Sequence, residues 1–489
     1  MSTASPSPRK AIGSVSAVVA SLLAAIFAFQ LNASMLSPVL ATMERELDAT
    51  SAEIGLSQTA FFAAAALFSL FLPRWGDLIG RKRLMLAILL FTGIGSVIAA
   101  IAPNVGILGL GRVVQGVSGP IVPMALIMLR VQVPDPRRYA KLMAVLTAIN
   151  GGIAGVDALL GGWLAESFGF RSVFWVMAAV SFVAVLAVAA GTIESRSSEH
   201  TTMDWKGVGA LVVVLGSLYF AFEEAGKLAD ANWLIVIGLA VLAAVAFIVF
   251  WAIETRVPHP MVTTTYLKER RTWALLSTTL LTMTGVFAVM NGLIPNLAQD
   301  PTLGNISAGE VSWWTLSPYA LAGLVMGPIA GQLAARFGYT RVLQAGLILT
   351  TLGLAVAAFI TSNPTPAVLL TISIFIGLTY AGIANIMLNG LGIVLSPKDN
   401  QGYLPGMNSG AFNLGAGLSF AVLFAINTYV SNQLDAAAGY RFGILAGAVL
   451  LLLALGTSLL IPRPGDSDDT TQPRPESDPT STHQEQNHG

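Results

Sequence analysis

The sequence predicts an all-α membrane protein in which fourteen membrane-spanning helices form two six-helix bundles with two extra central helices between them. Three observations support this fold class. Of 489 residues, 54% are hydrophobic and only 11% are charged, whereas soluble domains have about 25% charged residues. Apolar runs of about 20 residues, long enough to span a bilayer, recur along the chain. The first six and the last six of these runs also share an internal repeat.

The apolar runs form a group of six, a pair and a second group of six. They lie near residues 13–37, 54–73, 83–103, 106–130, 142–165, 171–192, 206–222, 232–253, 273–297, 313–335, 342–361, 366–395, 405–429 and 441–462. This spacing predicts an N-terminal segment, a first bundle, two extra helices, a linker, a second bundle and a tail, at residues 1–12, 13–193, 194–255, 256–272, 273–462 and 463–489. The tail is rich in Asp, Pro, Ser and Thr, which is typical of disorder.

The basic residues predict the orientation of the chain. The first run is too long for a signal peptide and lacks a cleavage site of small residues, so we expect it to be retained. With the N-terminus inside, the outer segments hold four of the 26 basic residues, namely Arg45, Arg171, Lys227 and Arg441. Because basic residues collect on the cytoplasmic side, we expect a multi-pass plasma-membrane protein with both termini in the cytoplasm.

The internal repeat has an offset of 258 residues and falls at the same place in each group of six runs. The matched pairs include Gly80 and Gly338, Arg83 and Arg341, Ala87 and Ala345, Leu89 and Leu347, Thr92 and Thr350, and Gly95 and Gly353. Parallel six-span halves predict a substrate site between the halves and alternating access by rocking of one half against the other.

The segment 73–83 is a short stretch of charge and glycine between the second and third runs. We predict a tight loop at the cytoplasmic face, with a gate formed by Asp77, Gly80, Arg81 and Lys82. A carboxylate at a helix end can accept hydrogen bonds from a neighbouring helix terminus or pair with an arginine, and rocking would break that contact. The alternative interpretation is a topological anchor without a moving part.

Two charged residues, Arg112 and Asp157, lie within the predicted spans and away from their ends. A charge at that depth costs several kcal/mol unless it is paired or hydrated, so both residues are functional candidates. Their similar depth on consecutive antiparallel helices makes an ion pair possible. We hypothesise that Asp157 binds the coupling proton and that Arg112 keeps the pKa of Asp157 in a usable range. The alternative is a static pair, or two residues on different faces.

Most other polar groups at bilayer depth are neutral and predict the lining of a substrate cavity. The candidates are Gln30, Asn32, Gln115, Asn291, Tyr319, Asn385, Asn389 and Asn413. Amides offer both donors and acceptors, which suits a solute with hydroxyl or amide groups. Asn385 and Asn389 are four residues apart and share one helix face. For any single residue the alternative is an ordinary interhelical hydrogen bond.

Several function classes are not indicated. The chain has no cysteine, its four histidines lie in polar segments, and it has no block of basic residues. We therefore expect no thiolate metal site and no nucleic-acid partner. A phosphate-binding loop of the G-x-x-x-x-G-K-S/T type is also absent, so an ion gradient is the expected energy source. We expect a monomer without cofactor or metal, and not an enzyme.

Two motifs resemble the major facilitator superfamily. Asp77, Gly80, Arg81 and Lys82 stand where the family has the loop G-x-L-A-D-R-x-G-R-K, although Pro73 replaces its first glycine. The stretch Arg-Val-Val-Gln-Gly at residues 112–116 matches the family motif R-x-x-Q-G. The fourteen-run layout is similar to that of the drug:proton antiporter branch.

The resemblance to that branch has two departures. Its fifth-span motif G-P-x-x-G-G here begins with Asp157 and Ala158 and keeps the final pair, Gly161 and Gly162. Its first-span acid, nine positions before a proline, is replaced by Phe29, counted from Pro38. Both departures weaken the inference of antiport.

The resemblance implies a proton-coupled secondary transporter that works by alternating access. Export of drugs or other amphiphiles in exchange for protons is the first expectation, because the branch layout is the broader signal. The alternative is proton-driven uptake of a polar neutral solute such as a nucleoside or sugar, which the two departures and the amide-rich interior favour. A receptor that binds its ligand without transporting it is a third possibility.

Overall fold

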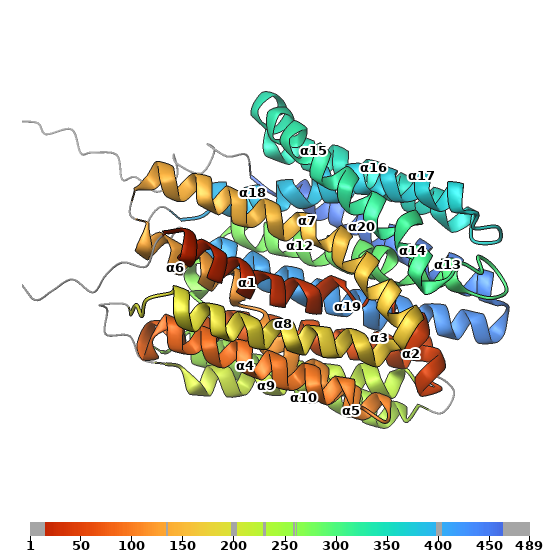
Figure 1. Cartoon of the computed structure of the whole chain (residues 1–489), viewed down its shortest axis with the longest axis horizontal. Helices are drawn as coiled ribbons and strands as arrows, with labels where there is room; N and C mark the ends of the chain where they lie inside the picture. The colour runs from red at the N-terminus through yellow and green to blue at the C-terminus, as the bar shows by residue number, and fades with distance from the viewer. Residues whose placement is uncertain are drawn as a thin grey trace, which may run out of the picture.

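The computed structural model describes residues 15–133, 135–196, 203–227, 231–257, 260, 262–397 and 403–462. Over these residues the chain is helical and contains no strand. The predicted N-terminal segment 1–12 and tail 463–489 lie outside the described residues. The helices run roughly along the long axis of the molecule, with α2 and α13 at one end and α6 and α18 at the other (Figure 1).

The first six predicted runs correspond to helices α1 to α8. Their bounds are α1 Val15–Ser34, α2 Leu40–Leu47, α3 Ser51–Ile79, α4 Arg81–Ala100, α5 Val105–Gln115, η1 Gly116–Ser118, α6 Ile121–Gln132, α7 Pro136–Phe168 and α8 Phe170–Gly191. The two extra helices are α9 Trp205–Ala225 and α10 Trp233–Glu254. We call α1–α8 the first half.

The remaining runs correspond to helices α12 to α20, which we call the second half, preceded by the short α11. Their bounds are α11 Thr264–Leu267, α12 Arg270–Ala288, η3 Val289–Leu293, α13 Ile294–Gln299, α14 Ala308–Trp314, α15 Leu316–Phe337, α16 Tyr339–Phe359, α17 Pro366–Ile376, η4 Gly377–Ala384, α18 Asn385–Val394, α19 Tyr403–Gln433 and α20 Ala436–Ser458. Thirteen segments of the described chain are long and apolar enough to cross a membrane. The helix α7, at 33 residues, is a further long helix.

The structure corrects the prediction of a loop at 73–83, because this segment is helical on both sides of Gly80. The helix α3 continues through Pro73 to Ile79, and α4 begins at Arg81, so a single residue separates the two helices. That residue is Gly80, whose φ of 116° lies in a region that side chains avoid. The prediction took charge as the sign of a loop, but the charged side chains sit on helix ends that can reach water.

The 258-residue repeat has a structural counterpart. Gly338, the mate of Gly80, also separates two consecutive helices, α15 and α16, with a φ of 86°. In the fourth span of each half, the regular α-helix ends just before a glycine that packs closely against the second span of the same half. A Cβ on Gly116 would lie 2.4 Å from Ala64 Cβ, and one on Gly377 would lie 2.4 Å from Tyr319 O.

The two halves pack through equivalent helices. The second span of the first half, α3, lies along the fifth span of the second half, α19, and α7 lies along α14 and α15 in the reciprocal arrangement. The extra helices α9 and α10 pack on each other, and α9 packs on α3. In Figure 1 α9 and α10 lie along the lower edge, and α15 to α17 lie along the upper edge.

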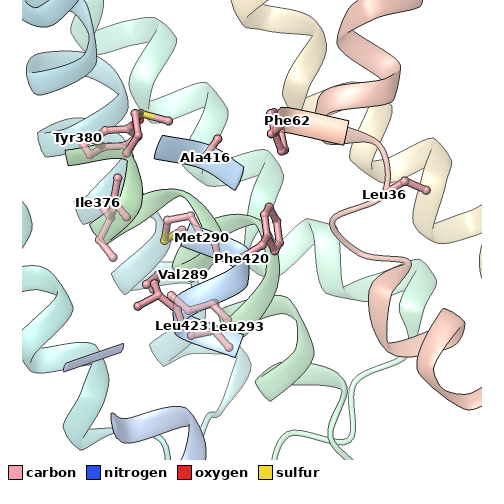
Figure 2. Close-up of a cluster of buried hydrophobic side chains, with 14 of the residues drawn as sticks. Leu36, Phe62, Val289, Met290, Leu293, Ile376, Tyr380, Ala416, Phe420 and Leu423 are labelled. Atoms are coloured by element: carbon pink, nitrogen blue, oxygen red, sulfur yellow. The ribbon is translucent and has the colours of Figure 1, made fainter. Parts of the chain in front are cut away.

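Aromatic and aliphatic side chains from both halves form a shared core. Phe62 of α3 contacts Phe287 of α12 and Phe420 of α19, with ring centroids 5.1 and 6.3 Å apart. Figure 2 shows Phe62 and Phe420 together with Met290, and with Leu36 from the coil between α1 and α2. The halves therefore meet through a buried apolar contact near the middle of the molecule.

Candidate functional site

Arg112 is the centre of a buried polar network in the first half. Its side chain is fully buried, and its guanidinium donates to Gln115 Oε1 at 2.7 Å and Gln58 Oε1 at 2.8 Å. It also donates to the backbone oxygen of Asn32 at 3.2 Å and lies 4.2 Å from the centre of the Phe61 ring. Such bonds compensate a desolvated charge, and they fix the end of α1 against α3 and α5.

Asp157 lies on the other side of α1. Its side chain is 3% exposed, and Oδ2 accepts a 2.5 Å hydrogen bond from Ser34 Oγ. The second oxygen, Oδ1, has no hydrogen-bond partner in the described part of the chain. Gln30 Nε2 donates to Ser34 Oγ at 2.9 Å, which extends the polar chain by one residue. A buried carboxylate with one free oxygen is poised to accept a proton or a donor.

The possible Arg112 to Asp157 ion pair is not formed. Arg112 reaches the backbone of Asn32, and Asp157 reaches the side chain of Ser34. These α1 residues are two positions apart and therefore point in different directions. The last turn of α1 stands between the two charges.

Five of the eight neutral candidates form hydrogen bonds in three different places, and Gln30 bonds to Ser34. Asn32 and Gln115 are fully buried beside Arg112 and belong to its network. Asn291 bonds across the halves, accepting from Ser37 Oγ at 3.3 Å. Asn385 and Asn389 do share a face, since the Asn389 side chain donates to the Asn385 backbone and side-chain oxygens at 2.9 and 3.2 Å.

Two further candidates lie in the second half. Tyr319 of α15 is partly buried, and its backbone contacts η4 at Gly377. Asn413 of α19 is 3% exposed and lies one residue from the partly buried Phe412. The neutral candidates therefore lie on helices of both halves. Asn32 and Gln115 differ from the others because they belong to the Arg112 network.

A path of aromatic rings runs between the halves. Phe29 of α1 stacks on Phe61, Phe61 contacts Phe62, and Phe62 contacts Phe287 of α12. The terminal rings, Phe29 and Phe287, are repeat mates at the 258-residue offset, and both are only partly buried. Phe412 of α19 joins Phe287 with ring centroids 6.0 Å apart. The centre of the molecule thus offers apolar ring faces beside amide groups.

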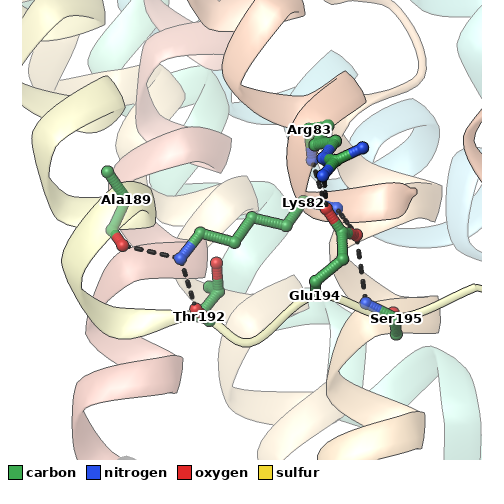
Figure 3. Close-up of polar contacts among 6 residues, drawn as sticks. All are labelled: Lys82, Arg83, Ala189, Thr192, Glu194 and Ser195. Carbon is green, nitrogen blue, oxygen red and sulfur yellow. Dashed lines mark hydrogen bonds and ion pairs between the residues drawn. The ribbon is translucent and has the colours of Figure 1, made fainter. Parts of the chain in front are cut away.

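The predicted gate residues make their contacts within the first half. Arg81 Nε pairs with Asp77 Oδ1 at 2.7 Å. Lys82 Nζ donates to the backbone oxygens of Ala189 and Thr192, at 2.6 and 2.7 Å, at the end of α8 (Figure 3). Asp77 therefore pairs with an arginine of the adjoining helix, four residues away, and its role as a gate stays a prediction.

Glu194 is the centre of a capping cluster that the prediction missed. Its carboxylate accepts from the backbone N–H groups of Lys82 and Arg83 at 3.0 and 3.2 Å, at the N-terminus of α4 (Figure 3). A carboxylate at this position is favoured by the helix dipole. A Cβ at Gly80 would lie 2.7 Å from the same carboxylate, so glycine is required there by space as well as by φ.

The opposite end of the molecule joins the two halves. We call it the α2 end; it contains α2 and the loop between α13 and α14, and the end with Gly80 and Gly338 is the Gly80 end. The hydrogen bonds that join the halves toward the α2 end include Asn296 Nδ2 to Glu44 Oε1 at 2.7 Å, Gln299 Nε2 to Pro38 O at 3.0 Å, Gly309 N to Glu166 Oε2 at 2.9 Å, Ser312 Oγ to Ala158 O at 2.9 Å and Ser317 Oγ to Gly155 O at 2.7 Å. The halves are closed against each other there.

Sequence reasoning missed several residues of these sites. Gln58, Ser96 and Ser34 are polar residues inside apolar runs, and that isolation could have marked them. Gln115 Nε2 donates to Ser96 Oγ at 2.9 Å, which completes the Arg112 network. Glu44 gave no signal, because an acidic residue between two spans is common.

Comparison with known proteins identifies the family. The chain matches the Major Facilitator Superfamily over residues 22–300 and 275–485. It is 55% identical over 464 residues to the uridine/deoxyuridine transporter of Lactococcus lactis, covering 94% of this chain and 96% of that protein. The chain belongs to the major facilitator superfamily. It is therefore a multi-pass membrane transporter of a small molecule, and the predicted family and all-helical fold are confirmed.

Other members of the superfamily are more distant. Multidrug resistance protein Stp of Mycobacterium tuberculosis is 24% identical over 409 residues, covering 82% of this chain and 74% of that protein. The crystal structure of nucleoside transporter NupG has a TM-score of 0.62 at 14% identity, covering 91% of this chain and 99% of that one. The transporter PepTSo has a TM-score of 0.60 at 15% identity, covering 91% and 97%. The two structures confirm the major facilitator fold.

Proposed function

We propose that this protein imports nucleosides by proton symport across the plasma membrane, with both termini in the cytoplasm, and that it works as a monomer. The observation that supports this most strongly is the 55% identity to a uridine/deoxyuridine transporter over nearly the full length of both chains. The relatives named for multidrug resistance are far less similar, at 24% for Stp. Uptake, which the sequence gave as the alternative, is thus better supported than export.

The chemistry of the centre supports a nucleoside substrate. A nucleobase has flat faces that stack on phenyl rings, and the partly buried Phe29 and Phe287 offer such rings. The base edge and the sugar hydroxyls need donors and acceptors, which amides supply. We assign the substrate contacts to the candidates outside the Arg112 network, namely Gln30, Asn291, Tyr319, Asn385, Asn389 and Asn413. Asn32 and Gln115 take a supporting role, because Arg112 already engages them.

Asp157 is the proposed site of the coupling proton. It is buried, its Oδ1 has no partner among the described residues, and it lies where α1 meets α7, close to the contact with α14 and α15. Rocking of the halves would change its access to water. Arg112 acts on this site through α1: it holds the backbone at Asn32, two residues from the Ser34 that binds Asp157.

Alternating access gives the transport cycle. The bonds at the α2 end match a state closed on that side, which is the outer side if the N-terminus is cytoplasmic. Opening the α2 end requires these bonds to break. The part of the contact between α7 and α14–α15 that lies nearest the α2 end must separate at the same time. The gate residues Asp77, Gly80, Arg81 and Lys82 would then engage the second half as the Gly80 end closes.

Flux into proteoliposomes tests the proposal. Purified protein is reconstituted, an inward-directed proton gradient is imposed, and uptake is measured for uridine, deoxyuridine, a sugar and a hydrophobic cation. We expect gradient-driven accumulation of the nucleosides, collapsing when a protonophore is added. Proton-driven efflux of the cation without nucleoside flux would favour export. Nucleoside binding without flux would favour a receptor.

A further inference from the structure

Glu44 is a titratable group at the contact between the halves. It lies on α2, outside the spans, and its carboxylate accepts from the Asn296 side chain of α13 at 2.7 Å. The Ser51 side chain, in the first turn of α3, lies near the same carboxylate and lowers its pKa. One acid therefore joins α2, α3 and the second half at the closed end of the molecule.

We propose that Glu44 is a proton-binding site whose protonation stabilises the closed state of the α2 end. The proposal relies on alternating access but not on the identity of the substrate. It differs from the Asp157 site because Glu44 faces the outer solution when the α2 end opens and returns its proton to the same side. Glu44 would thus sense outside acidity without carrying protons across the membrane.

The surroundings of Glu44 make closure sensitive to its charge. The pKa of Glu44 is raised from 4.5 to about 7, mainly by burial and to a lesser extent by the nearby Asp300. Ser51, the bond from Asn296 and the charge of Arg45 oppose that rise without cancelling it. Tyr440 of α20 lies close enough for the charge of Glu44 to act on it. From α8, Arg171 pairs with Glu46 instead, at 3.3 Å.

The sign of the effect follows from linkage. When the α2 end opens, Glu44 is hydrated and its pKa returns toward 4.5, so the closed state binds more protons than the open state. The ratio of closed to open protein therefore rises as the pH falls from about 7 toward 4.5. The slope is at most about tenfold per pH unit for one group.

Spin labels across the α2 end measure this ratio. The chain has no native cysteine, so Pro103→Cys and Asn363→Cys can be labelled directly at two exposed positions, one on each half. The inter-label distance is measured between pH 4.5 and 8.5 in lipid nanodiscs without substrate. An Asp157→Asn background removes the other proposed proton site. We expect the short-distance population to grow as the pH falls through about 7.

Two substitutions decide the proposal. Glu44→Gln, a neutral mimic that can still accept from Asn296, should stay closed at every pH. The matched control Glu46→Gln, two residues away on the same helix, should keep the pH response. Asn296→Ala removes a bond that favours the charged carboxylate and should move the midpoint to higher pH.

An unchanged pH response in Glu44→Gln would overturn the proposal, as would an unmoved midpoint in Asn296→Ala. Since no nucleoside is present, failure here is distinct from failure of the uptake assay. The two tests therefore separate the role of Glu44 from the identity of the substrate.

Discussion

In the part of the chain that the structure describes, the Asp157 carboxylate accepts a side-chain hydrogen bond from Ser34, and its Oδ1 has no partner. Such a group is expensive to bury, and a charged carboxylate more so than a neutral acid. In contrast, the equally buried Arg112 has three side-chain or backbone acceptors and a ring face. Among the described residues, Arg112 leaves only its Nε without a partner, while Asp157 leaves a whole carboxylate oxygen, Oδ1, and a carboxyl group can take up a proton there. At the scale of single residues, that is why the proton site is assigned to Asp157.

The substitution Asp157→Asn tests that assignment. It keeps the shape and the acceptor for Ser34 but cannot titrate. We expect gradient-driven accumulation of uridine to fall to the background level, while exchange of labelled for unlabelled uridine continues. Asp48→Asn is the matched control: Asp48 is exposed, and its φ of 50° suits asparagine equally well. Retained proton-driven accumulation in Asp157→Asn would refute the assignment.

The sequence predicted which residues are unusual but not how they pair. Arg112 and Asp157 stood out because they are charges in apolar runs, and both are buried as that reasoning requires. Their partners depend on which faces of α1 meet α5 and α7. A hydropathy pattern locates the helices but does not predict how each helix is rotated about its own axis. Glu44 escaped notice for the same reason, since its importance comes from Asn296, which is 252 positions away.

At the scale of helices, the spans are interrupted where they press on one another. The fourth spans break at Gly116 and Gly377, and the first span of the second half contains the π-turn η3 at Val289–Leu293. Local departures from α-helix geometry mark functional hinges in many helices. The sequence predicted most spans to within a few residues, but it did not predict these breaks or the short helices α2 and α11, because composition is apolar on both sides of each break.

The close approach at Gly377 gives a stability prediction. An added methyl group would lie 2.4 Å from Tyr319 O, a backbone atom that cannot rotate away. We expect Gly377→Ala to lower the free energy of unfolding by about 1–3 kcal/mol, seen as a lower midpoint of thermal unfolding in detergent. Gly216→Ala on α9 meets nothing within 4 Å and should be neutral or slightly stabilising. Equal midpoints for the two variants would contradict this account.

At the scale of the whole molecule, the reciprocal packing of α3 on α19 and of α7 on α14 and α15 supports rocking about the centre. The core around Phe62 and Phe420 lies between the two ends and would act as the pivot. The internal repeat predicted this architecture, because matched glycines at the same place in each half require similar helix pairs. Which end is closed could not be predicted, since both conformations share one sequence.

Rocking predicts opposite changes at the two ends. Labels at Arg83 and Arg341 report on the Gly80 end, and labels at Pro103 and Asn363 report on the α2 end; all four positions are exposed. On addition of uridine, one distance should shorten while the other lengthens. Arg83 lies in the first turn of α4 and Pro103 lies just after its end, so the distance between this pair should stay constant. Changes of the same sign at both ends would contradict rocking.

The helix α10 is the most hydrophobic span, with a mean hydropathy of 3.0 and only 17% of its apolar window covered by protein. Its 22 residues rise through about 33 Å, close to the thickness of the hydrocarbon slab. Trp233 at one end is 60% exposed, as expected for a ring seated among lipid headgroups. The length of this lipid-facing helix therefore helps to set the depth of the transporter in the bilayer. A bilayer of different thickness would change that depth.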